Sequence, residues 1–203
     1  MEQKNMWAFE EECFAQGYVS VCGVDEAGRG PLAGPVCAAA VILPPEIEIP
    51  GLNDSKKLTD KRRRALYDVI IENAVSYGIA MVHEKEIDEI NILQATFNAM
   101  EQAILQLSVK PAMALIDGNR ERPFPVPVQT VVKGDSLSAN IAAASILAKV
   151  TRDRYMEEMA EQYPQYGFEV HKGYGTKAHY AALTEHGMSP IHRRTFLKKF
   201  YGE

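Results

Sequence analysis

The stretch 18–43 reads YVSVCGVDEAGRGPLAGPVCAAAVIL, and it decides the fold that the sequence predicts. An apolar run leads directly into two adjacent carboxylates, Asp25 and Glu26, and a turn rich in glycine and proline separates this run from a second one. Apolar runs of this length with Gly and Pro at their ends are typical of strands. We therefore predict strands at about 18–25 and 35–43, with Asp25 at the inner edge of a sheet.

The two carboxylates and the turn that follows them indicate a site for metal ions and phosphate. Ionising a carboxylate such as Asp25 at the inner edge of a sheet is costly unless the charge has a partner, and a divalent metal ion is a common one. Gly28 and Gly30 have no Cβ and let the backbone approach a ligand closely, while the guanidinium of Arg29 can bind a phosphate. Acidic pairs such as Asp25 and Glu26 also occur in solvated surface turns, and these residues alone leave that alternative open.

The same turn formally matches the dinucleotide-binding pattern G-x-G-x-x-G/A through Gly28, Gly30 and Ala33. That pattern requires a helix that opens inside the motif and points its N-terminus at a pyrophosphate. Pro31 and Pro35 are instead followed by a strand-like run, and the neighbouring acids would repel a pyrophosphate without metal. The sequence therefore disfavours a nicotinamide-dependent oxidoreductase.

Length and composition indicate one ordinary domain. The chain has 203 residues, of which 46 % are hydrophobic, and it holds no run of 18 apolar residues that could span a membrane. The N-terminal segment is acidic and amphipathic, unlike a signal peptide. Three cysteines without metal-ligand spacing predict buried thiols in a reducing cytoplasm: Cys13, Cys22 and Cys37.

The charge distribution favours a polyanionic ligand although the net charge is −5. Clustered charge matters more than the sum for such a ligand. One basic cluster, with Asp60 as its only acid, spans the junction between a loop and a predicted helix and comprises Lys56, Lys57, Lys61, Arg62, Arg63 and Arg64. A second lies near the C-terminus and comprises Lys172, Lys177, Arg193, Arg194, Lys198 and Lys199. Two solvated helix faces would give the same pattern, so charge alone does not establish a polyanionic ligand.

Hydrophobic periodicity predicts the remaining elements. Helices are expected at 2–15, 60–73, 84–107, 136–159, 177–186 and 192–201, and strands at 75–83, 112–117 and 127–132. The helix at 60–73 has Thr59 as its N-cap and Leu66, Val69 and Ile70 on its inner face. The helix at 136–159 has an unusually small inner face, which permits close packing on the sheet. The resulting order β-β-α-β-α-β-β-α predicts a mixed α/β fold.

Three of the predicted strands end in acids: Asp25 with Glu26, then Asp117, then Asp135. Neighbouring strand ends can bring these carboxylates within reach of one metal centre, and such oxygen ligands suit Mg²⁺ or Mn²⁺. Two ions about 4 Å apart could activate a water and stabilise a leaving oxygen. Strand ends also carry solvated aspartates, and that reading stays open on the residues alone.

Other polar residues are weaker candidates for catalysis. Asp153 lies 18 residues beyond Asp135, about 27 Å along a continuous helix, so we expect a local pair with Arg152 or Arg154. Four histidines fall in the basic C-terminal part, where phosphate contact or a plain surface position is expected: His171, His179, His186 and His192. No G-x-S-x-G elbow supports nucleophilic serine chemistry.

Tyr174 is the strongest candidate for contact with a sugar or base. It lies between Gly173 and Gly175, which predicts an exposed and rigidly placed ring suited to stacking. A tyrosine in a tight surface turn is the competing interpretation.

With these motifs, the sequence VDEAGRGPLAGPV at 24–36 resembles the signature of the type 2 ribonuclease H family, ribonuclease HII. The resemblance extends over nearly the whole chain. It implies a ribonuclease H-like fold with a five-stranded mixed sheet, a catalytic domain at 1–160 that begins at about residue 18, and a basic helical extension at 161–203 that helps to bind substrate.

The resemblance also implies roles for individual residues. The catalytic, metal-binding carboxylates would be Asp25, Glu26, Asp117 and Asp135. Substrate would be bound by Gly28, Arg29, Gly30, Lys56 and Tyr174, with Lys57, Lys172, Arg193 and Arg194 on the nucleic-acid backbone.

The function implied is cleavage of RNA in RNA–DNA hybrids, including a single ribonucleotide in duplex DNA, on the 5′ side of the ribonucleotide. The products would carry 5′-phosphate and 3′-hydroxyl ends, and two Mg²⁺ or Mn²⁺ ions would bind together with substrate. We expect a cytoplasmic monomer without a membrane partner. The alternatives are a type 3 relative restricted to longer hybrids and a non-catalytic nucleic-acid-binding module.

Overall fold

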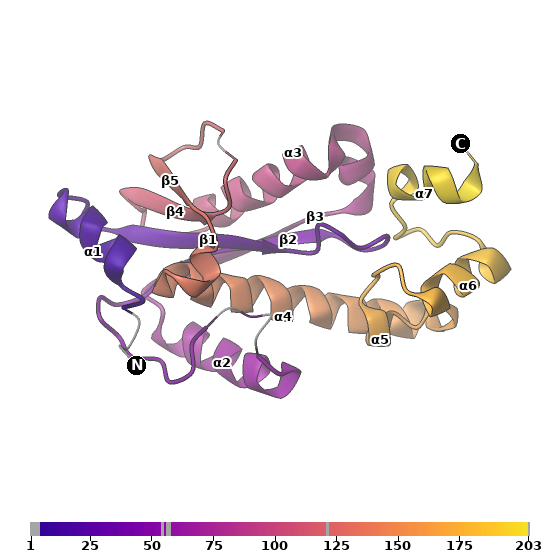
Figure 1. The fold of residues 1–203 in the computed structure, drawn as a ribbon, viewed down its shortest axis with the longest axis horizontal. Coiled ribbons are helices and arrows are strands. Elements are labelled where there is room, and N and C mark those ends of the chain that lie inside the picture. Colours follow the sequence, from indigo (N-terminus) through magenta and orange to yellow (C-terminus); the bar gives the residue numbers. More distant parts are fainter. Residues whose placement is uncertain (1–4, 54, 56–57, 121, 203) are drawn as a thin grey trace.

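A five-stranded sheet with helices on both faces forms the body of the protein (Figure 1). The computed structural model describes residues 5–53, 55, 58–120 and 122–202. Its strands are β1 (Val21–Ala27), β2 (Val36–Ile42), β3 (Ser76–Val82), β4 (Met113–Asp117) and β5 (Val128–Val131). Its α-helices are α1 (Ala8–Ala15), α2 (Asp60–Asn73), α3 (Glu84–Leu105), α4 (Ala139–Gln162), α5 (Phe168–His171), α6 (Lys177–His186) and α7 (Arg194–Tyr201).

The sheet is mixed, as the sequence predicted. Its strand order is β3-β2-β1-β4-β5, with antiparallel pairing of β1 with β2 and of β2 with β3, and parallel pairing of β1 with β4 and of β4 with β5. Helix α3 covers one face, and α4 with α2 covers the other (Figure 1). No helix within the described ranges is long and apolar enough to cross a bilayer.

Strand β1 continues past the residue at which we expected it to end. Asp25 and Glu26 still pair with β2, opposite Ala39 and Ala38, whereas the ladder to β4 stops at Val24 and its partner Ile116. The end of the ladder between β1 and β4 therefore leaves an opening in the sheet beside Asp25. Acids from other elements can approach Asp25 through this opening.

Close packing of α4 on β1 fixes the position of this opening. The small residues predicted for the inner face of α4 are all buried: Ala142, Ala143, Ser145 and Ala148. Gly23 of β1 lies directly beneath the helix, where a Cβ would overlap the backbone of Asn140 and Ile141. The helix begins at Ala139 with Ser138 as N-cap, three residues later than predicted, because Gly134–Ser136 form a separate 3₁₀ turn, η2.

Helix α2 has the predicted bounds and the predicted cap, since the Thr59 side chain accepts a hydrogen bond from the Arg62 N–H. Leu66 and Ile70 are buried as expected. Val69 is 37 % exposed, so the prediction that it faces the core is wrong.

The single helix predicted at 84–107 is kinked. Asn91 adopts φ 68°, and its side-chain oxygen accepts hydrogen bonds from the N–H groups of Leu93 and Gln94. With ψ at 163°, Asn91 lies in a backbone region that is essentially restricted to glycine, and its two side-chain hydrogen bonds cap the helix that follows. The kink separates the first two turns of α3, which include the buried Ile87, from the rest of the helix, and both parts pack on the sheet.

The C-terminal segment packs on the end of α4 and on the loop after β1. One buried cluster joins Leu32 and Ala33 of that loop, Met156 of α4, and Phe168 and Leu197 of the C-terminal helices. The loop between β1 and β2 is therefore held from both sides.

Candidate metal centre and substrate pocket

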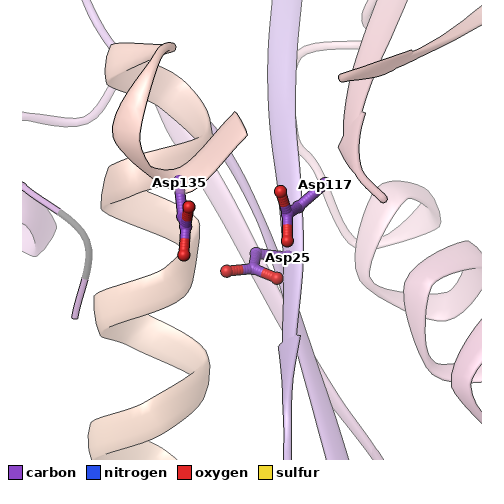
Figure 2. A group of neighbouring side chains, drawn as sticks. All are labelled: Asp25, Asp117 and Asp135. Atoms are coloured by element: carbon purple, nitrogen blue, oxygen red, sulfur yellow. The ribbon is translucent and has the colours of Figure 1, made fainter. Parts of the chain in front are cut away.

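Three aspartates from different elements converge at the open side of β1 (Figure 2). Asp25 lies in β1, Asp117 ends β4 and Asp135 lies in η2. One carboxylate oxygen from each lies within 4.8 Å of the others, and Asp25 and Asp135 are only 4 % and 5 % exposed. Buried carboxylates at this spacing repel one another unless a cation lies between them. Hard oxygen donors of this kind fit Mg²⁺ or Mn²⁺.

The turn after β5 brings Asp135 to this site. Lys133 adopts the left-handed conformation, φ 59°, and turns the chain back from the sheet into η2. The Gly134 N–H then donates to Asp117 Oδ1 at 2.6 Å, which holds the turn against the end of β4. The sequence indicated the strand end but not this turn.

Glu26 stands apart from the three aspartates. It follows Asp25 in a strand, so its side chain emerges on the opposite face of the sheet. Its carboxylate lies 3.4 Å from the Arg29 guanidinium. Glu26 and Asp117 also line one surface pocket. The structure thus brings three of the four predicted carboxylates together and places the fourth beside them.

A cavity of about 220 Å³ joins Asp25 and Glu26 to predicted substrate residues. Its walls comprise Asp25, Glu26, Ala27, Gly28, Arg29, Gly30, Ser55, Ser145, Lys149 and Tyr174. The Tyr174 side chain is exposed, as predicted, and lies next to Gly30, where a Cβ would be 3.7 Å from the ring. Lys56 and Lys57, also predicted to bind the backbone, lie outside the described residues.

Lys149 is a cavity residue that the sequence reasoning missed. Its ammonium donates to Asp153 Oδ1 at 2.7 Å, and Asp153 is buried. The predicted pairing of Asp153 with Arg152 or Arg154 is therefore wrong. The spacing of Lys149 and Asp153, four residues apart on a helix, is the signal that could have revealed the pair.

Arg193 is buried, and each of its three side-chain nitrogens donates to a backbone carbonyl of the glycine-rich loop. The acceptors are Gly28 at 2.6 Å, Arg29 at 3.0 Å and Gly34 at 2.9 Å. Burial lowers the pKa of Arg193 to about 9. With 0 % of its surface exposed, Arg193 has no position from which to contact a phosphate, contrary to the sequence prediction.

Arg152 holds the other end of the same loop. Its guanidinium donates to the carbonyls of Pro35 at 2.9 Å, Ala33 at 3.0 Å and Lys172 at 3.0 Å. Burial lowers its pKa as well. The two arginines together fix residues 28–35 by hydrogen bonds to backbone oxygens.

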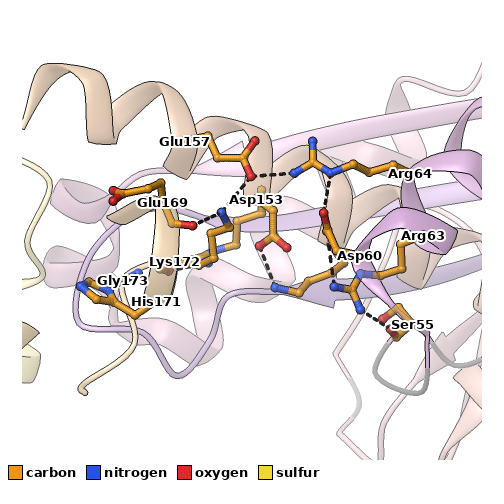
Figure 3. Close-up of polar contacts among 12 residues, drawn as sticks. Ser55, Asp60, Arg63, Arg64, Asp153, Glu157, Glu169, His171, Lys172 and Gly173 are labelled. Carbon is orange, nitrogen blue, oxygen red and sulfur yellow. Dashed lines mark hydrogen bonds and ion pairs between the residues drawn. The ribbon is translucent and has the colours of Figure 1, made fainter. Parts of the chain in front are cut away.

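The other predicted backbone contacts differ in their surroundings. Lys172 donates to Glu157 at 2.8 Å and to the Glu169 carbonyl at 2.6 Å, so its ammonium is held within the protein and not directed at solvent (Figure 3). The Arg64 guanidinium donates to the same Glu157 oxygen at 2.6 Å. Arg194 is exposed, as a phosphate contact requires.

Three of the four C-terminal histidines are buried, so the expected surface position is wrong for His171, His179 and His192. They fill the space between α5, α6 and the loop before α7, with the rings of His171 and His179 stacked at 4.4 Å. His186 alone keeps a partly exposed side chain. Sequence patterns do not reveal such packing because it depends on the way three short elements meet.

This arrangement defines the class of the protein. A five-stranded mixed sheet of the ribonuclease H-like fold, with aspartates gathered from β1, β4 and the turn after β5, is the framework of hydrolytic endoribonucleases that depend on divalent metal. The model of one family, described as "Ribonuclease HII", matches residues 22–199. The chain belongs to the ribonuclease HII family and is a ribonuclease H endonuclease.

Curated relatives carry the same description over most of their length. Ribonuclease HII of Endomicrobium trichonymphae is 55 % identical over 193 residues, which cover 95 % of this chain and 92 % of the relative. Ribonuclease HII of Halalkalibacterium halodurans is 54 % identical over 196 residues, which cover 97 % of this chain and 74 % of the relative.

Solved structures confirm the fold. Ribonuclease H2 from Pyrococcus horikoshii is 31 % identical with a TM-score of 0.72, and the match covers 87 % of this chain and 93 % of that one. Ribonuclease HII from Archaeoglobus fulgidus, solved in complex with PCNA, is 27 % identical with a TM-score of 0.73, and the match covers 86 % and 94 %.

Proposed function

We propose that this enzyme cleaves the RNA strand of RNA–DNA hybrids and also a single ribonucleotide within duplex DNA. The cut is on the 5′ side of the ribonucleotide and leaves 5′-phosphate and 3′-hydroxyl ends. The observation that carries the proposal is the cavity that Asp25 and Glu26 share with the loop 28–30 and Tyr174. The carboxylates proposed for cleavage and the residues proposed to recognise the ribonucleotide therefore line the same cavity.

The carboxylates would hold two Mg²⁺ or Mn²⁺ ions in this proposal. Bound divalent ions lower the pKa of an attacking water and stabilise the charge on a leaving oxygen. Asp25, Asp117 and Asp135 provide the buried oxygen donors, and Glu26 can join them from the sheet edge. The pair of Glu26 with the half-exposed Arg29 is not an obstacle, because a solvent-exposed ion pair contributes about 0–1 kcal/mol.

The glycine-rich loop would recognise the ribose. A trans peptide unit directs its C=O and N–H in opposite directions. Because Arg193 binds the carbonyls of Gly28 and Arg29, the N–H groups of Arg29 and Gly30 are directed away from Arg193. Only the 2′-hydroxyl distinguishes a single ribonucleotide from its DNA neighbours, so groups that approach it closely are required.

A labelled DNA duplex with one ribonucleotide tests the proposal directly. In Mg²⁺ we expect one cut on the 5′ side of the ribonucleotide, no cut in the all-DNA duplex, and no cut in EDTA. Cleavage of long RNA–DNA hybrids alone would favour the type 3 alternative. Binding of hybrid without any cleavage would favour a non-catalytic module.

Gly28→Ala and Gly30→Ala are expected to act by different routes. Gly28 has φ +94°, and a Cβ there would overlap the Arg152 side chain, so the loop must distort. Gly30 has room for a Cβ at 3.7 Å from the Tyr174 ring, so Gly30→Ala should leave the free enzyme intact. A left-handed non-glycine residue costs about 1–3 kcal/mol, which predicts a lower melting temperature for Gly28→Ala only.

Both glycine variants should lose more cleavage at an isolated ribonucleotide than binding to duplex. The ratio of cleavage to binding, measured beside thermal unfolding, checks this expectation. Full cleavage by a stably folded Gly30→Ala variant would mean that substrate does not approach the loop backbone.

Tyr174→Phe should retain most activity, because the stacking face survives. Tyr174→Ala should lose on the order of 1–3 kcal/mol of substrate interaction, measured as binding of the single-ribonucleotide duplex in Ca²⁺ or as cleavage rate in Mg²⁺. Equal losses in the two variants would assign the role to the hydroxyl and not to stacking.

We also propose a monomeric enzyme of the cytoplasm. The three cysteines are buried and unpaired, and burial raises the pKa of Cys22 and Cys37 to about 12, which suits inert thiols in a reducing compartment. Sedimentation velocity at increasing protein concentration would detect a dimer.

A further inference from the structure

A chain of hydrogen bonds between buried histidine rings leads to the backbone of Tyr174. His192 Nε2 and His179 Nε2 lie 2.9 Å apart, and His179 Nδ1 lies 2.9 Å from the Tyr174 carbonyl oxygen. At the far end, His192 Nδ1 lies 2.9 Å from the Ser189 N–H nitrogen. His179 and His192 are 0 % and 3 % exposed, and neither borders the metal-site cavity.

The protonation of both rings follows from the Ser189 end. A backbone N–H can only donate, so His192 Nδ1 accepts from Ser189 and carries no proton. The Ser189 hydroxyl lies 2.8 Å from the same nitrogen and donates to it in this arrangement. A neutral His192 then carries its proton on Nε2 and donates it to His179 Nε2. His179 Nε2 is therefore an acceptor, and a neutral His179 carries its proton on Nδ1.

The Tyr174 end gives the same answer independently. A carbonyl oxygen can only accept, so His179 Nδ1 must be the donor to Tyr174. Every link of the chain is then satisfied by one arrangement of protons with both rings uncharged. The direction of donation runs from Ser189 through His192 and His179 to Tyr174.

We infer that His179 and His192 are positioning residues that hold the Tyr174 backbone, and with it the ring beside Gly30, and that they do so only while both rings are neutral. The importance of this ring for cleavage rests on the function proposed above. The hydrogen-bond arrangement itself does not depend on it.

The peptide that precedes Tyr174 is held by two hydrogen bonds, and the Tyr174 carbonyl accepts from the Thr176 N–H at 2.8 Å as well as from His179. The Tyr174 N–H donates to the His171 carbonyl at 2.9 Å, and the preceding Gly173 carbonyl accepts from the Leu32 N–H at 2.8 Å. Gly173 has φ +85° and no room for a Cβ against the Ala33 carbonyl. The ring therefore projects from a clamped peptide over the loop that contains Gly30.

A proton on either ring would break the chain. A charged His179 would direct an Nε2–H at the Nε2–H of His192. A charged His192 would direct an Nδ1–H at the Ser189 N–H and lose that hydrogen bond, and only the Ser189 hydroxyl oxygen could accept the new proton. Burial first, and then the neighbouring histidines, lowers the pKa of His192 to about 4, and burial lowers the pKa of His179.

Other titratable groups face this cluster. The rings of His171 and Tyr166 pack on it from α5 and the turn before it, and Arg193 follows His192 in sequence. The cavity on the other side of His192 also contains Glu84, Lys85, Asp88, Glu89 and Arg194. Its three acids favour a charged His192 and its two bases oppose this. In the described part of the chain none of the five hydrogen-bonds to the His192 ring.

Long-range ¹H–¹⁵N correlation spectra of the free enzyme test the inference without substrate. We expect His192 as the Nε2–H tautomer and His179 as the Nδ1–H tautomer, both still neutral at the ordinary histidine pKa of about 6.5. His186, whose side chain is partly exposed, serves as the internal control in the same spectra. The opposite tautomer in either ring, or titration of either near 6.5, would overturn the inference.

Two substitutions of His192 test the link to Tyr174. Glutamine can place an amide N–H near the position of Nε2 and keep the donor to His179, whereas asparagine is too short to do so. We expect His192→Asn to lower cleavage at a single ribonucleotide about tenfold and His192→Gln to retain most of it, with His186→Gln unchanged. In the Tyr174→Ala background neither His192 variant should lower cleavage further, because residues that act through one another are not additive.

The outcomes separate the two proposals. Equal losses by His192→Asn with and without the Tyr174 ring would mean that His192 does not act through Tyr174. Full activity of Tyr174→Ala would contradict the proposed role of the ring, while the tautomers seen in the spectra would still report on the histidine chain.

Discussion

Asp25→Asn is expected to reduce cleavage by on the order of 10³-fold or more while the fold remains. An amide has the shape of the carboxylate but lacks the charge that binds a divalent ion, and metal stabilisation of the reacting charges supplies several kcal/mol. Asp25 lies within 4.8 Å of Asp117 and Asp135, so the three charges also repel one another without metal. We therefore expect metal-free Asp25→Asn to unfold at a higher temperature than the wild type.

Magnesium provides a readout apart from activity. An ion that binds only the folded state raises the melting temperature, so Mg²⁺ should stabilise the wild type and leave Asp25→Asn nearly unaffected. Glu26→Gln should also lose cleavage, but its metal-free stability should change little because Glu26 stands outside the aspartate group. Asp68→Asn, at a side chain that is 69 % exposed, is the matched control.

Asp117→Asn and Asp135→Asn should lose cleavage for the same reason, and near-normal rates in any two of the four carboxylate variants would contradict this site. Equal stabilisation of Asp25→Asn and wild type by Mg²⁺ would do the same. The comparison needs only purified protein, thermal unfolding with and without Mg²⁺, and the labelled duplex.

The strands and their acids could be predicted because each depends on a short segment. The strand that ends at Asp117 is indicated by the apolar run just before it, and the start of α2 is indicated by its N-cap, Thr59. Both signals lie within a few residues of the feature they predict. The parallel pairing of β1 with β4 then brings Asp25 and Asp117 side by side. Asp135 was predicted to lie near them and does so, although the 3₁₀ turn that places it was not foreseen.

Features that depend on distant contacts could not be predicted. Arg193 and Lys172 look like surface cations in a basic segment, yet one binds three backbone carbonyls and the other pairs with Glu157. Their partners lie 15 or more residues away in sequence, and no local pattern indicates them. The kink at Asn91 is a partial exception, because asparagine is a common helix cap.

Arg193→Met is expected to weaken both the fold and the recognition of a ribonucleotide. The change leaves the carbonyls of Gly28, Arg29 and Gly34 without their donor, and a buried polar group without a partner costs about 1–3 kcal/mol. The summed loss is a large fraction of a typical stability of about 5–15 kcal/mol. Once the carbonyls are released, the N–H groups of Arg29 and Gly30 lose their fixed direction, so cleavage at a single ribonucleotide should fall about 100-fold or more.

Arg194→Met is the matched control, because the two arginines are adjacent and only Arg193 is buried. The Arg194 N–H that donates to Asp88 belongs to the backbone and survives the substitution. If the exposed Arg194 side chain contacts a phosphate, its loss should weaken binding to all duplexes and reduce the slope of log affinity against log salt by about 1. Arg193→Met should leave that slope unchanged and lower the melting temperature instead. An Arg193→Met variant with wild-type stability and a reduced salt slope would show that Arg193 binds phosphate after all, because a side chain held entirely by loop carbonyls releases no counterions.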